Sequence, residues 1–264
     1  NLGAMHNTAG DVGSYGLFYQ WGRKDPFPAA PTLTGTTATV GAPIYDGDDN
    51  EIKITNSSQS STADNNLAFA IANPTVCLSN YAQFNTSRDW LQADMSNDAL
   101  WGNPKGAERN ETNDFLNKGA KSFYDPCPVG WRVPPADVFR NFTASGGYAW
   151  VIDDFDIADI SGDGAKSLAD YDYGWTFNLS DSASSYFPAA ARFDGSYAML
   201  MGSMSGFWGS YWGNAPYPGD MFQGGAYSVL SFQIKDTAGN EMITTSPAGG
   251  GARADAYSVH CIRE

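Results

Sequence analysis

One stretch of the sequence has the oxygen-bearing residues and the spacing of a calcium-binding loop. Residues 159–170 read Asp-Ile-Ser-Gly-Asp-Gly-Ala-Lys-Ser-Leu-Ala-Asp, with oxygen ligands at loop positions 1, 3, 5, 9 and 12 and glycine at position 6. A hard cation held in a tight turn needs this pattern. The candidate ligands are Asp159, Ser161, Asp163 and Asp170. Lys166 stands where an apolar residue is usual, and the last ligand is the shorter aspartate, so a solvated acidic turn is the alternative.

Residues for catalysis are sparse. The two histidines are His6 and His260, and His260 falls in a segment that reads as a strand, where a lone histidine is usually structural. The sequence has no Gly-x-Ser-x-Gly elbow, phosphate-binding loop, dinucleotide fingerprint or Cys-x-x-Cys pair. Carboxylates are plentiful, but a glycosidase needs two of them at a set separation across a cleft, which a sequence does not reveal. We therefore predict that the protein is not an enzyme and requires no cofactor.

The three cysteines, Cys77, Cys127 and Cys261, fit one disulfide and one free thiol. Three pairings are open, and three buried thiols in a reducing compartment are the alternative. We favour the pair Cys127 and Cys261, which closes a loop of well over a hundred residues. In the chain-entropy model such a loop contributes about 4–5 kcal/mol of stability.

The charge balance narrows the range of partners. Among 264 residues, Lys and Arg number 15 and Asp and Glu 29, which gives a formal net charge of −14. An acidic chain repels phosphate backbones and anionic lipid surfaces, so we expect neither nucleic acid nor a membrane surface as a partner. No apolar run reaches the ~18 residues of a membrane span. The first residues also lack the basic and apolar regions of a signal peptide.

The aromatic content points to a loop-rich, strand-rich chain. With 8 Trp, 14 Tyr, 15 Phe and 29 Gly, the composition suits short strands rather than a helical bundle. We predict a single domain over residues 1–264, with a loop-rich insertion around residues 28–75 that includes a hairpin near residues 51–55.

Local patterns predict the elements that position these residues. Leu17, Phe18 and Trp21 fall at helical spacing, which predicts a short helix that ends at Gly22. Another short helix is expected from residue 135, where proline follows an extended stretch. Alternating polar and apolar residues predict strands at 174–177, 186–187, 227–232 and 256–262. The residues assigned to the core are Trp21, Trp90, Leu91, Leu100, Trp101, Trp131 and Trp175.

Several motifs together carry a resemblance to a known family. They are Asn-Leu-Gly-Ala at 1–4, Tyr-Gly-Leu-Phe-Tyr-Gln-Trp-Gly-Arg-Lys-Asp-Pro-Phe at 15–27, Asp-Pro-Cys-Pro-Val-Gly-Trp-Arg-Val-Pro at 125–134 and Ala-Tyr-Ser-Val-His-Cys-Ile-Arg at 256–263. Residues 186–192 and 209–216 fit the same template. The chain resembles the Fibrobacter succinogenes major paralogous domain family, found in surface lipoproteins and fimbria-associated proteins of gut Bacteroidales. The match is weakest over residues 28–75 and 144–185.

The resemblance implies an α+β, C-type-lectin-like fold with two short helices, a small twisted antiparallel sheet and long loops. It also implies an extracellular location, anchored at the outer membrane or in a fimbria, and a chain that begins inside a longer protein. Similar lectin-like domains are the variable proteins of diversity-generating retroelements, and the corresponding segment here would run from about Phe193 to His260. The additional Cys77, and Gly213 and Asn214 where two serines are common, depart from the family pattern.

The aromatic and small residues near the C-terminus resemble the composition of antibody paratopes. We therefore predict an adhesin-like domain that binds a surface glycan or protein through Tyr211, Trp212, Asn214, Tyr217, Asp220 and Phe222. Core packing is the alternative for Trp208 and Trp212, and we favour it for at least one of them. A structural pilus subunit that pairs strands with other subunits is the alternative function. The copper site of the related formylglycine-generating oxidases is not expected, because Cys127 and Cys261 lack its surrounding motif.

Overall fold

The structure of the chain is a computed structural model. It describes residues 1–38, 40–57, 66–79, 89–91, 98–103, 119–135, 138–139, 142–143, 152–216, 225–233, 242–244 and 250–264. Of residues 56–57, 225–233, 242–244 and 250, the backbone alone is described.

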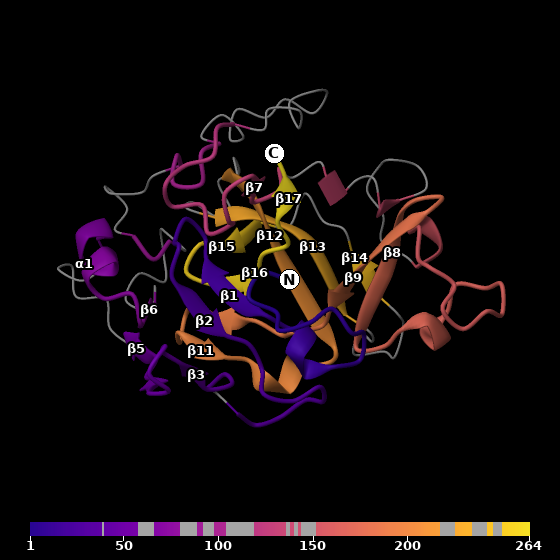
Figure 1. Ribbon diagram of the computed structural model, residues 1–264, viewed down its shortest axis with the longest axis horizontal. Helices are drawn as coiled ribbons and strands as arrows, with labels where there is room; N and C mark the ends of the chain where they lie inside the picture. The colour runs from indigo at the N-terminus through magenta and orange to yellow at the C-terminus, as the bar shows by residue number, and fades with distance from the viewer. Residues whose placement is uncertain are drawn as a thin grey trace.

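The described residues form a nine-stranded sheet at the centre of the molecule (Figure 1). Its main path runs β11 (Met199–Leu200), β10 (Phe193–Asp194), β16 (Ala256–Ser258), β12 (Trp208–Pro216), β13 (Gly225–Gln233) and β14 (Met242–Thr244). Beside this path, β1 (Leu17–Gln20) pairs with β16 and with β2 (Pro26–Pro28), and β15 (Gly250–Ala252) pairs with β13. The pairs are antiparallel except β12 with β16, which is parallel.

Four two-stranded sheets accompany the central sheet in the described part of the chain. They are β7 (Trp131–Arg132) with β17 (Ile262–Arg263), β3 (Ile44–Tyr45) with β4 (Glu51–Ile52), β5 (Thr55–Ser57) with β6 (Val76–Leu78), and β8 (Gly174–Ser180) with β9 (Ala183–Pro188). In Figure 1 the β8–β9 ribbon stands to one side of the central sheet. The β3–β4 pair confirms a hairpin within the insertion, although residues 55–57 leave it and pair in parallel with β6.

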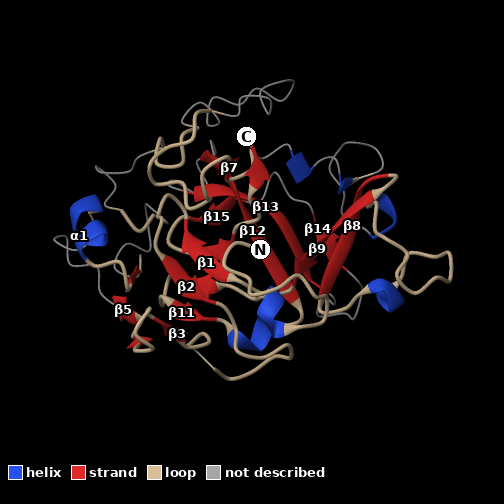
Figure 2. Cartoon of the chain, in the orientation of Figure 1, coloured by secondary structure: helices blue, strands red, loops and turns tan. Residues whose placement is uncertain are grey.

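Among the residues with described structure, helices are few and short (Figure 2). In the described part of the chain, the α-helical element is α1 (Leu67–Ala72), which Asn66 caps by accepting a hydrogen bond from the Phe69 backbone N–H. The 3-10 turns are η1 (Val12–Ser14), η7 (Ile152–Asp154), η8 (Leu168–Asp170) and η9 (Gly202–Met204). The protein is thus sheet-rich with little helix, which is compatible with the predicted α+β class.

The helix expected at residues 17–22 is wrong, because this segment is strand β1. Phe18, Tyr19 and Gln20 are all buried, since β1 pairs with β16 on one edge and β2 on the other and is covered on both faces. A strand buried on both faces reads as a continuous apolar run, which periodicity does not separate from a helix. The helix expected after residue 135 lies largely outside the described residues.

The expected strands at 174–177, 186–187 and 227–232 are confirmed as β8, β9 and β13. The segment 256–262 forms two strands rather than one, because β16 ends at Ser258 and β17 begins at Ile262. These two strands pair with different partners, β16 within the central sheet and β17 with β7.

The interior is built from three clusters of buried apolar side chains. The predicted core residues Trp21, Trp90, Leu91, Leu100, Trp101 and Trp175 are all buried in these clusters or beside them. The prediction for Trp131 is wrong, since 45% of its surface is exposed. Trp131 closes a turn by donating its backbone N–H to the Pro128 carbonyl, and this turn carries the fully exposed Val129. Among the described residues no helix is both long and apolar enough to span a bilayer.

Candidate functional site

Three of the predicted ligand contacts lie in the interior. Tyr211, Trp212 and Asn214 each have 0% of their surface exposed, so the prediction that they face a ligand is wrong. The Tyr211 hydroxyl donates to the Pro188 carbonyl at 2.6 Å, and Asn214 Oδ1 accepts a hydrogen bond from Asn103. The favoured alternative, core packing, is confirmed for Trp212. The other three predicted contacts lie outside the described residues, and they are Tyr217, Asp220 and Phe222.

The position of β12 explains this burial. The strand lies between β16 and β13 in the central sheet, and every residue after Trp208 is buried. Aromatic and small residues fill such a doubly covered strand, and the same mixture is typical of exposed binding loops. Amino-acid composition therefore does not distinguish a buried central strand from an exposed binding loop.

The first residue of β12 has a different environment. Trp208 is partly exposed, and the Arg192 guanidinium lies over its indole ring, 5.4 Å from the centroid. The two residues come together because Ala191 donates its N–H to the Trp208 carbonyl at 2.9 Å. Such a cation–π contact is worth about 0.5–2 kcal/mol, depending on its desolvation.

Arg192 leads into the β10–β11 hairpin, which borders the sheet. Phe193 is buried on one face of β10, so Arg192 and Asp194 lie on the opposite face. Met199 on β11 lies opposite Asp194, and Met201, which follows β11, lies opposite Arg192 and donates its N–H to the Arg192 carbonyl; both methionines are partly exposed. We call this area the Arg192 surface, and its members are Arg192, Asp194, Met199, Met201 and Trp208.

A buried polar network forms the base of the Arg192 surface. Arg192 Nη1 donates to the Tyr257 hydroxyl at 3.3 Å, and this hydroxyl donates to Asp255 Oδ2 at 2.7 Å. The Gly195 N–H donates to the other oxygen of Asp255 at 2.7 Å. The Tyr257 ring stacks on Trp212 with centroids 4.1 Å apart, so the network rests on the core.

The backbone beside Arg192 is held in an uncommon conformation. Ala191 and Ala198 have φ values of +68° and +50°, in the left-handed region that L-residues other than glycine seldom adopt. Each costs of order ~1 kcal/mol, which the surrounding contacts must offset. The hairpin that presents Arg192 is therefore fixed by packing and by hydrogen bonds at both ends.

Electrostatics keep the guanidinium charged. Burial opposes ionisation of Arg192, but Tyr257, Asp255 and Asp194 outweigh it and raise the pKa of the side chain. Burial raises the pKa of Asp255 as well, although Arg192 counteracts this effect. Both Asp255 oxygens accept hydrogen bonds from uncharged donors, and Asp255 Oδ2 lies 3.9 Å from Arg192 Nη1. Within the described part of the chain, Arg192 Nε is unpartnered and no hydrogen bond involves Nη2.

The predicted calcium loop closes on its own backbone. Asp159 accepts hydrogen bonds from the Gly162 and Gly164 N–H groups at 2.7 and 3.0 Å. Asp170 accepts three backbone N–H groups, two at Oδ1 and one at Oδ2. Burial opposes ionisation of Asp170, but these donors outweigh it and lower the pKa of the carboxyl.

Ser161 and Asp163 belong to the same exposed loop, where Asp163 accepts the Ala165 N–H at 2.8 Å. No group of three or more His, Cys, Asp or Glu side chains that could hold a metal ion occurs in the described ranges. Calcium binding by this loop stays a prediction.

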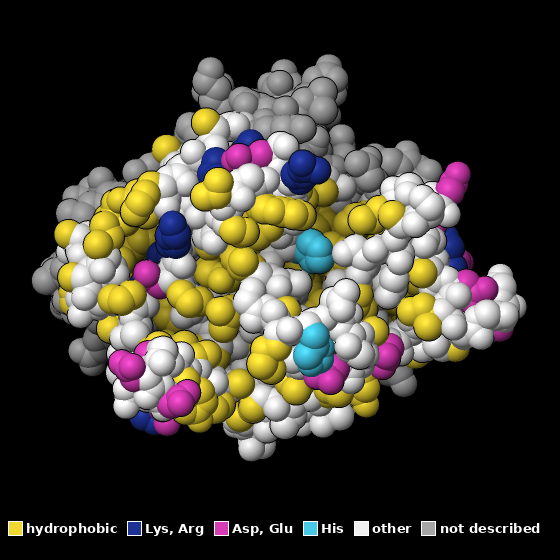
Figure 3. All heavy atoms as spheres, in the orientation of Figure 1, with side chains coloured by type: hydrophobic (Ala, Val, Ile, Leu, Met, Phe, Trp, Pro, Cys, Tyr) yellow, Lys and Arg dark blue, Asp and Glu magenta, His cyan; other side chains and the backbone are white. Residues whose placement is uncertain are grey.

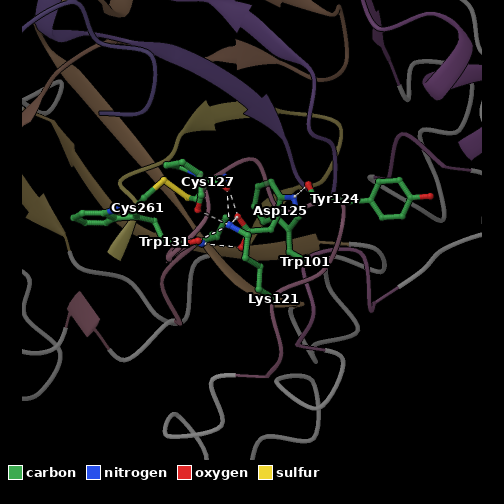
Figure 4. Close-up of a disulfide and its surroundings, with 9 residues drawn as sticks. Trp101, Lys121, Tyr124, Asp125, Cys127, Trp131 and Cys261 are labelled. Atoms are coloured by element: carbon green, nitrogen blue, oxygen red, sulfur yellow. Dashed lines mark hydrogen bonds and ion pairs between the residues drawn. A yellow bond between two sulfur atoms is a disulfide. The ribbon is translucent and has the colours of Figure 1, made fainter. Parts of the chain in front are cut away.

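The predicted disulfide between Cys127 and Cys261 is confirmed, with Cα atoms 5.9 Å apart (Figure 4). Lys121 secures the loop that carries Cys127, because its Nζ donates to the carbonyls of Cys127 and Pro128 at 2.6 and 2.9 Å, and to that of Trp131. The third cysteine, Cys77, is a buried free thiol. Burial raises the pKa of Cys77 to about 12, so its thiol is protonated and unreactive at neutral pH.

The environment of His260 agrees with a structural role. Its ring stacks on Phe187 with centroids 4.3 Å apart, and Nε2 lies 3.3 Å from Ser185 Oγ. Burial lowers the pKa of His260 to about 3, so the imidazole is neutral at physiological pH. On the face drawn in Figure 3, the described Lys and Arg side chains form separate spots rather than a continuous basic patch.

No family model, curated protein or solved structure matches this chain. The family resemblance therefore stays a prediction. Sequence reasoning missed the Arg192 surface, although Arg192 lies inside a stretch that carries the resemblance and Trp208 was weighed between core and contact. The missing information is the juxtaposition of β10 with the start of β12, which depends on the strand order of the sheet.

Proposed function

We propose that this chain is an adhesin-like, C-type-lectin-like domain of a bacterial cell surface or fimbria, and that it binds a glycan or protein receptor at the Arg192 surface. The observation that carries the proposal is the charged Arg192 guanidinium fixed over the partly exposed Trp208. A charged donor and an aromatic ring held in place beforehand lose little conformational freedom when a ligand binds, and this favours affinity.

The base beneath this pair supports binding by a preformed site. Tyr257 links Arg192 to Asp255 and stacks on the buried Trp212, so the guanidinium does not need to be ordered by the ligand. Residues fixed by such a supporting shell are typical of specific binding surfaces.

The disulfide supports the extracellular part of the proposal. Disulfides such as Cys127–Cys261 persist in oxidising compartments and are rare where thiols are kept reduced. The bond joins the motif at 125–134 to the end of the chain and so staples distant segments of the sequence.

The alternative, a structural pilus subunit that pairs strands with its neighbours, receives less support. Strand β2 has one partner strand, β1, among the described residues, and two of its three residues are Pro26 and Pro28. Proline lacks the N–H that an added strand would need, and natural sheets use it to block edge pairing.

The test is binding of the purified domain to a glycan and mucin array, in calcium and in chelator, with Arg192→Ala beside the wild type. Arg263→Ala is the control, because it removes one exposed positive charge from β17, which is not part of the Arg192 surface. We expect binding that falls about tenfold or more in Arg192→Ala and is retained in Arg263→Ala.

Loss in both variants would point to overall charge rather than to this surface. If the folded wild type bound none of the glycans and mucins on the array, this result would contradict glycan recognition and favour a protein receptor. The two calcium conditions test the predicted role of the loop at residues 159–170.

A further inference from the structure

We propose that the ligand of the Arg192 surface is an uncharged glycan, bound through its hydroxyl groups, rather than a sialylated, uronic-acid or sulfated one. This inference rests on the proposed function and names its ligand class. It follows from the donors, the acceptors and the charges that the surface holds.

The surface offers one hydrogen-bond donor and one acceptor side by side. Arg192 Nη2 takes part in no hydrogen bond within the described chain, and a quarter of the side chain, 23%, is exposed. Asp194 uses one oxygen, Oδ1, to accept the Ser196 N–H at 2.8 Å, and among the described residues no hydrogen bond involves its second oxygen, Oδ2. A sugar hydroxyl both donates and accepts, so neighbouring hydroxyl groups can satisfy the guanidinium and the carboxylate together.

The local charge disfavours an anionic ligand. Asp255 Oδ2 lies 3.9 Å from Arg192 Nη1, and Asp194 lies on the same face of β10 as Arg192, so carboxyl groups already flank the guanidinium. A carboxylate or sulfate brought to Arg192 would meet Asp194 on the same face of β10. The whole chain, with a net charge of −14, adds long-range repulsion.

A cationic ligand is disfavoured by repulsion from the Arg192 guanidinium. Its positive charge would have to approach the guanidinium of Arg192. That guanidinium is fixed in place, because it packs over the Trp208 ring and its Nη1 donates to the Tyr257 hydroxyl. Of the three charge classes, the uncharged polyhydroxyl ligand alone avoids repulsion from both Arg192 and Asp194.

The apolar side chains of the Arg192 surface suit the apolar C–H face of a sugar ring. Trp208, Met199 and Met201 are partly exposed beside the polar pair. The C–H groups of a pyranose ring can pack on such side chains while its hydroxyls bind the donor and the acceptor.

The experiment compares matched pairs of glycans on an array, each pair consisting of a neutral oligosaccharide and its sialylated or uronic-acid counterpart. The proteins are the wild type, Asp194→Asn and Asp181→Asn. Asp194→Asn keeps an acceptor and removes the charge from the surface. Asp181→Asn removes the same charge from the exposed turn between β8 and β9.

We expect the wild type to bind the neutral member of a pair about tenfold or more tightly than its acidic counterpart. Asp194→Asn should narrow this ratio by raising binding of the acidic member, while Asp181→Asn should leave it unchanged. Equal or tighter binding of acidic glycans by the wild type would overturn the inference and leave the proposed function standing. Silence of the folded protein toward both classes would overturn glycan recognition itself.

Discussion

The ring of Trp212 stacks on the ring of Tyr257, with centroids 4.1 Å apart and planes inclined by 19°. The Trp212 indole N–H donates to the Tyr19 carbonyl at 2.7 Å, and the hydroxyl of Tyr257 accepts a hydrogen bond from Arg192. This stack connects the buried core to the Arg192 surface, so the two tryptophans near the start of β12 have different roles. Trp212 supports the fold, and Trp208 faces the ligand in our proposal.

Replacement of Trp212 by alanine should therefore unfold the protein readily. The change leaves a cavity beside Tyr257, and we expect the free energy of unfolding to fall by about 3–5 kcal/mol. Denaturant unfolding measures this loss. Phe123→Ala, at an aromatic that is 80% exposed, is the control and should cost less than about 1 kcal/mol. Equal costs for the two variants would contradict the assignment of Trp212 to the core.

Removal of the disulfide should also lower stability. The bond spans 134 residues, and the chain-entropy model gives a contribution of about 5 kcal/mol for a loop of this length. We expect the double variant Cys127→Ala/Cys261→Ala to lose most of this amount in denaturant unfolding. Cys77→Ala should leave the disulfide intact, as mass analysis of the alkylated protein would show. A bond that forms through Cys77 in the wild type would contradict the pairing.

Lys121 should stabilise the loop that carries Cys127. Its Nζ donates to the carbonyls of Cys127 and Pro128 at 2.6 and 2.9 Å and to that of Trp131, and it lies 3.6 Å from Oδ1 of the almost fully buried Asp125. Lys121→Met keeps the aliphatic chain and removes these contacts, so we expect a loss of about 2–3 kcal/mol near neutral pH. The control is Lys53→Met, whose partner Glu51 is exposed, and it should cost less than about 1 kcal/mol.

The cost of Lys121→Met should shrink in acid. Burial raises the pKa of Asp125, and Lys121 opposes that rise, so loss of the lysine makes the charged carboxylate less favourable. Protonation of Asp125 relieves this penalty. Unfolding curves recorded at neutral and at acidic pH would reveal the difference, and a cost that grew as the pH fell would contradict the proposed role.

His260 should make stability fall in mild acid. Its pKa is about 3 in the folded protein, against about 6.5 in the unfolded chain, so the unfolded state binds more protons between these values. The contribution is fully present above about pH 6.5 and falls by about 1.4 kcal/mol per pH unit below it, until about pH 3.

The measurement for His260 is the difference in unfolding free energy between wild type and His260→Phe across this pH range. Phenylalanine preserves the stacking on Phe187 and removes the titrating group. We expect the pH slope to be smaller in the variant. A parallel His6→Gln variant removes the other histidine, and a slope that disappeared with His6 instead would show that His260 is not its source.

The sequence predicted those parts of the fold that local patterns determine. Alternation of polar and apolar residues predicted β8, β9 and β13, and the cysteine count predicted one disulfide, for which we favoured the pair Cys127 and Cys261. Periodicity failed for β1, where coverage on both faces removes the alternation on which strand prediction depends. Trp131 was assigned to the core together with Trp21 and Trp175, whereas the turn at Pro128 leaves 45% of its surface exposed.

The site was harder to predict than the fold because it depends on contacts between distant strands. Asn214 and its neighbours on β12 are buried by the order of strands in the sheet, which no local pattern specifies. The contact between Arg192 and Trp208 likewise arises from the way the segment before β10 meets β12. Within the predicted calcium loop, Asp159 and Asp170 accept hydrogen bonds from the loop backbone, a use of carboxylates that spacing does not distinguish from metal binding.

Recognition at the Arg192 surface is best tested by comparing the glycan binding of Trp208→Ala with that of Trp131→Ala. Both tryptophans expose part of their surface, one on the Arg192 surface and one on the turn beside the disulfide. Circular dichroism and thermal unfolding first establish that both variants fold. We expect Trp208→Ala to lose about tenfold or more of the array signal and Trp131→Ala to bind like the wild type. Full binding by folded Trp208→Ala would contradict recognition at the Arg192 surface.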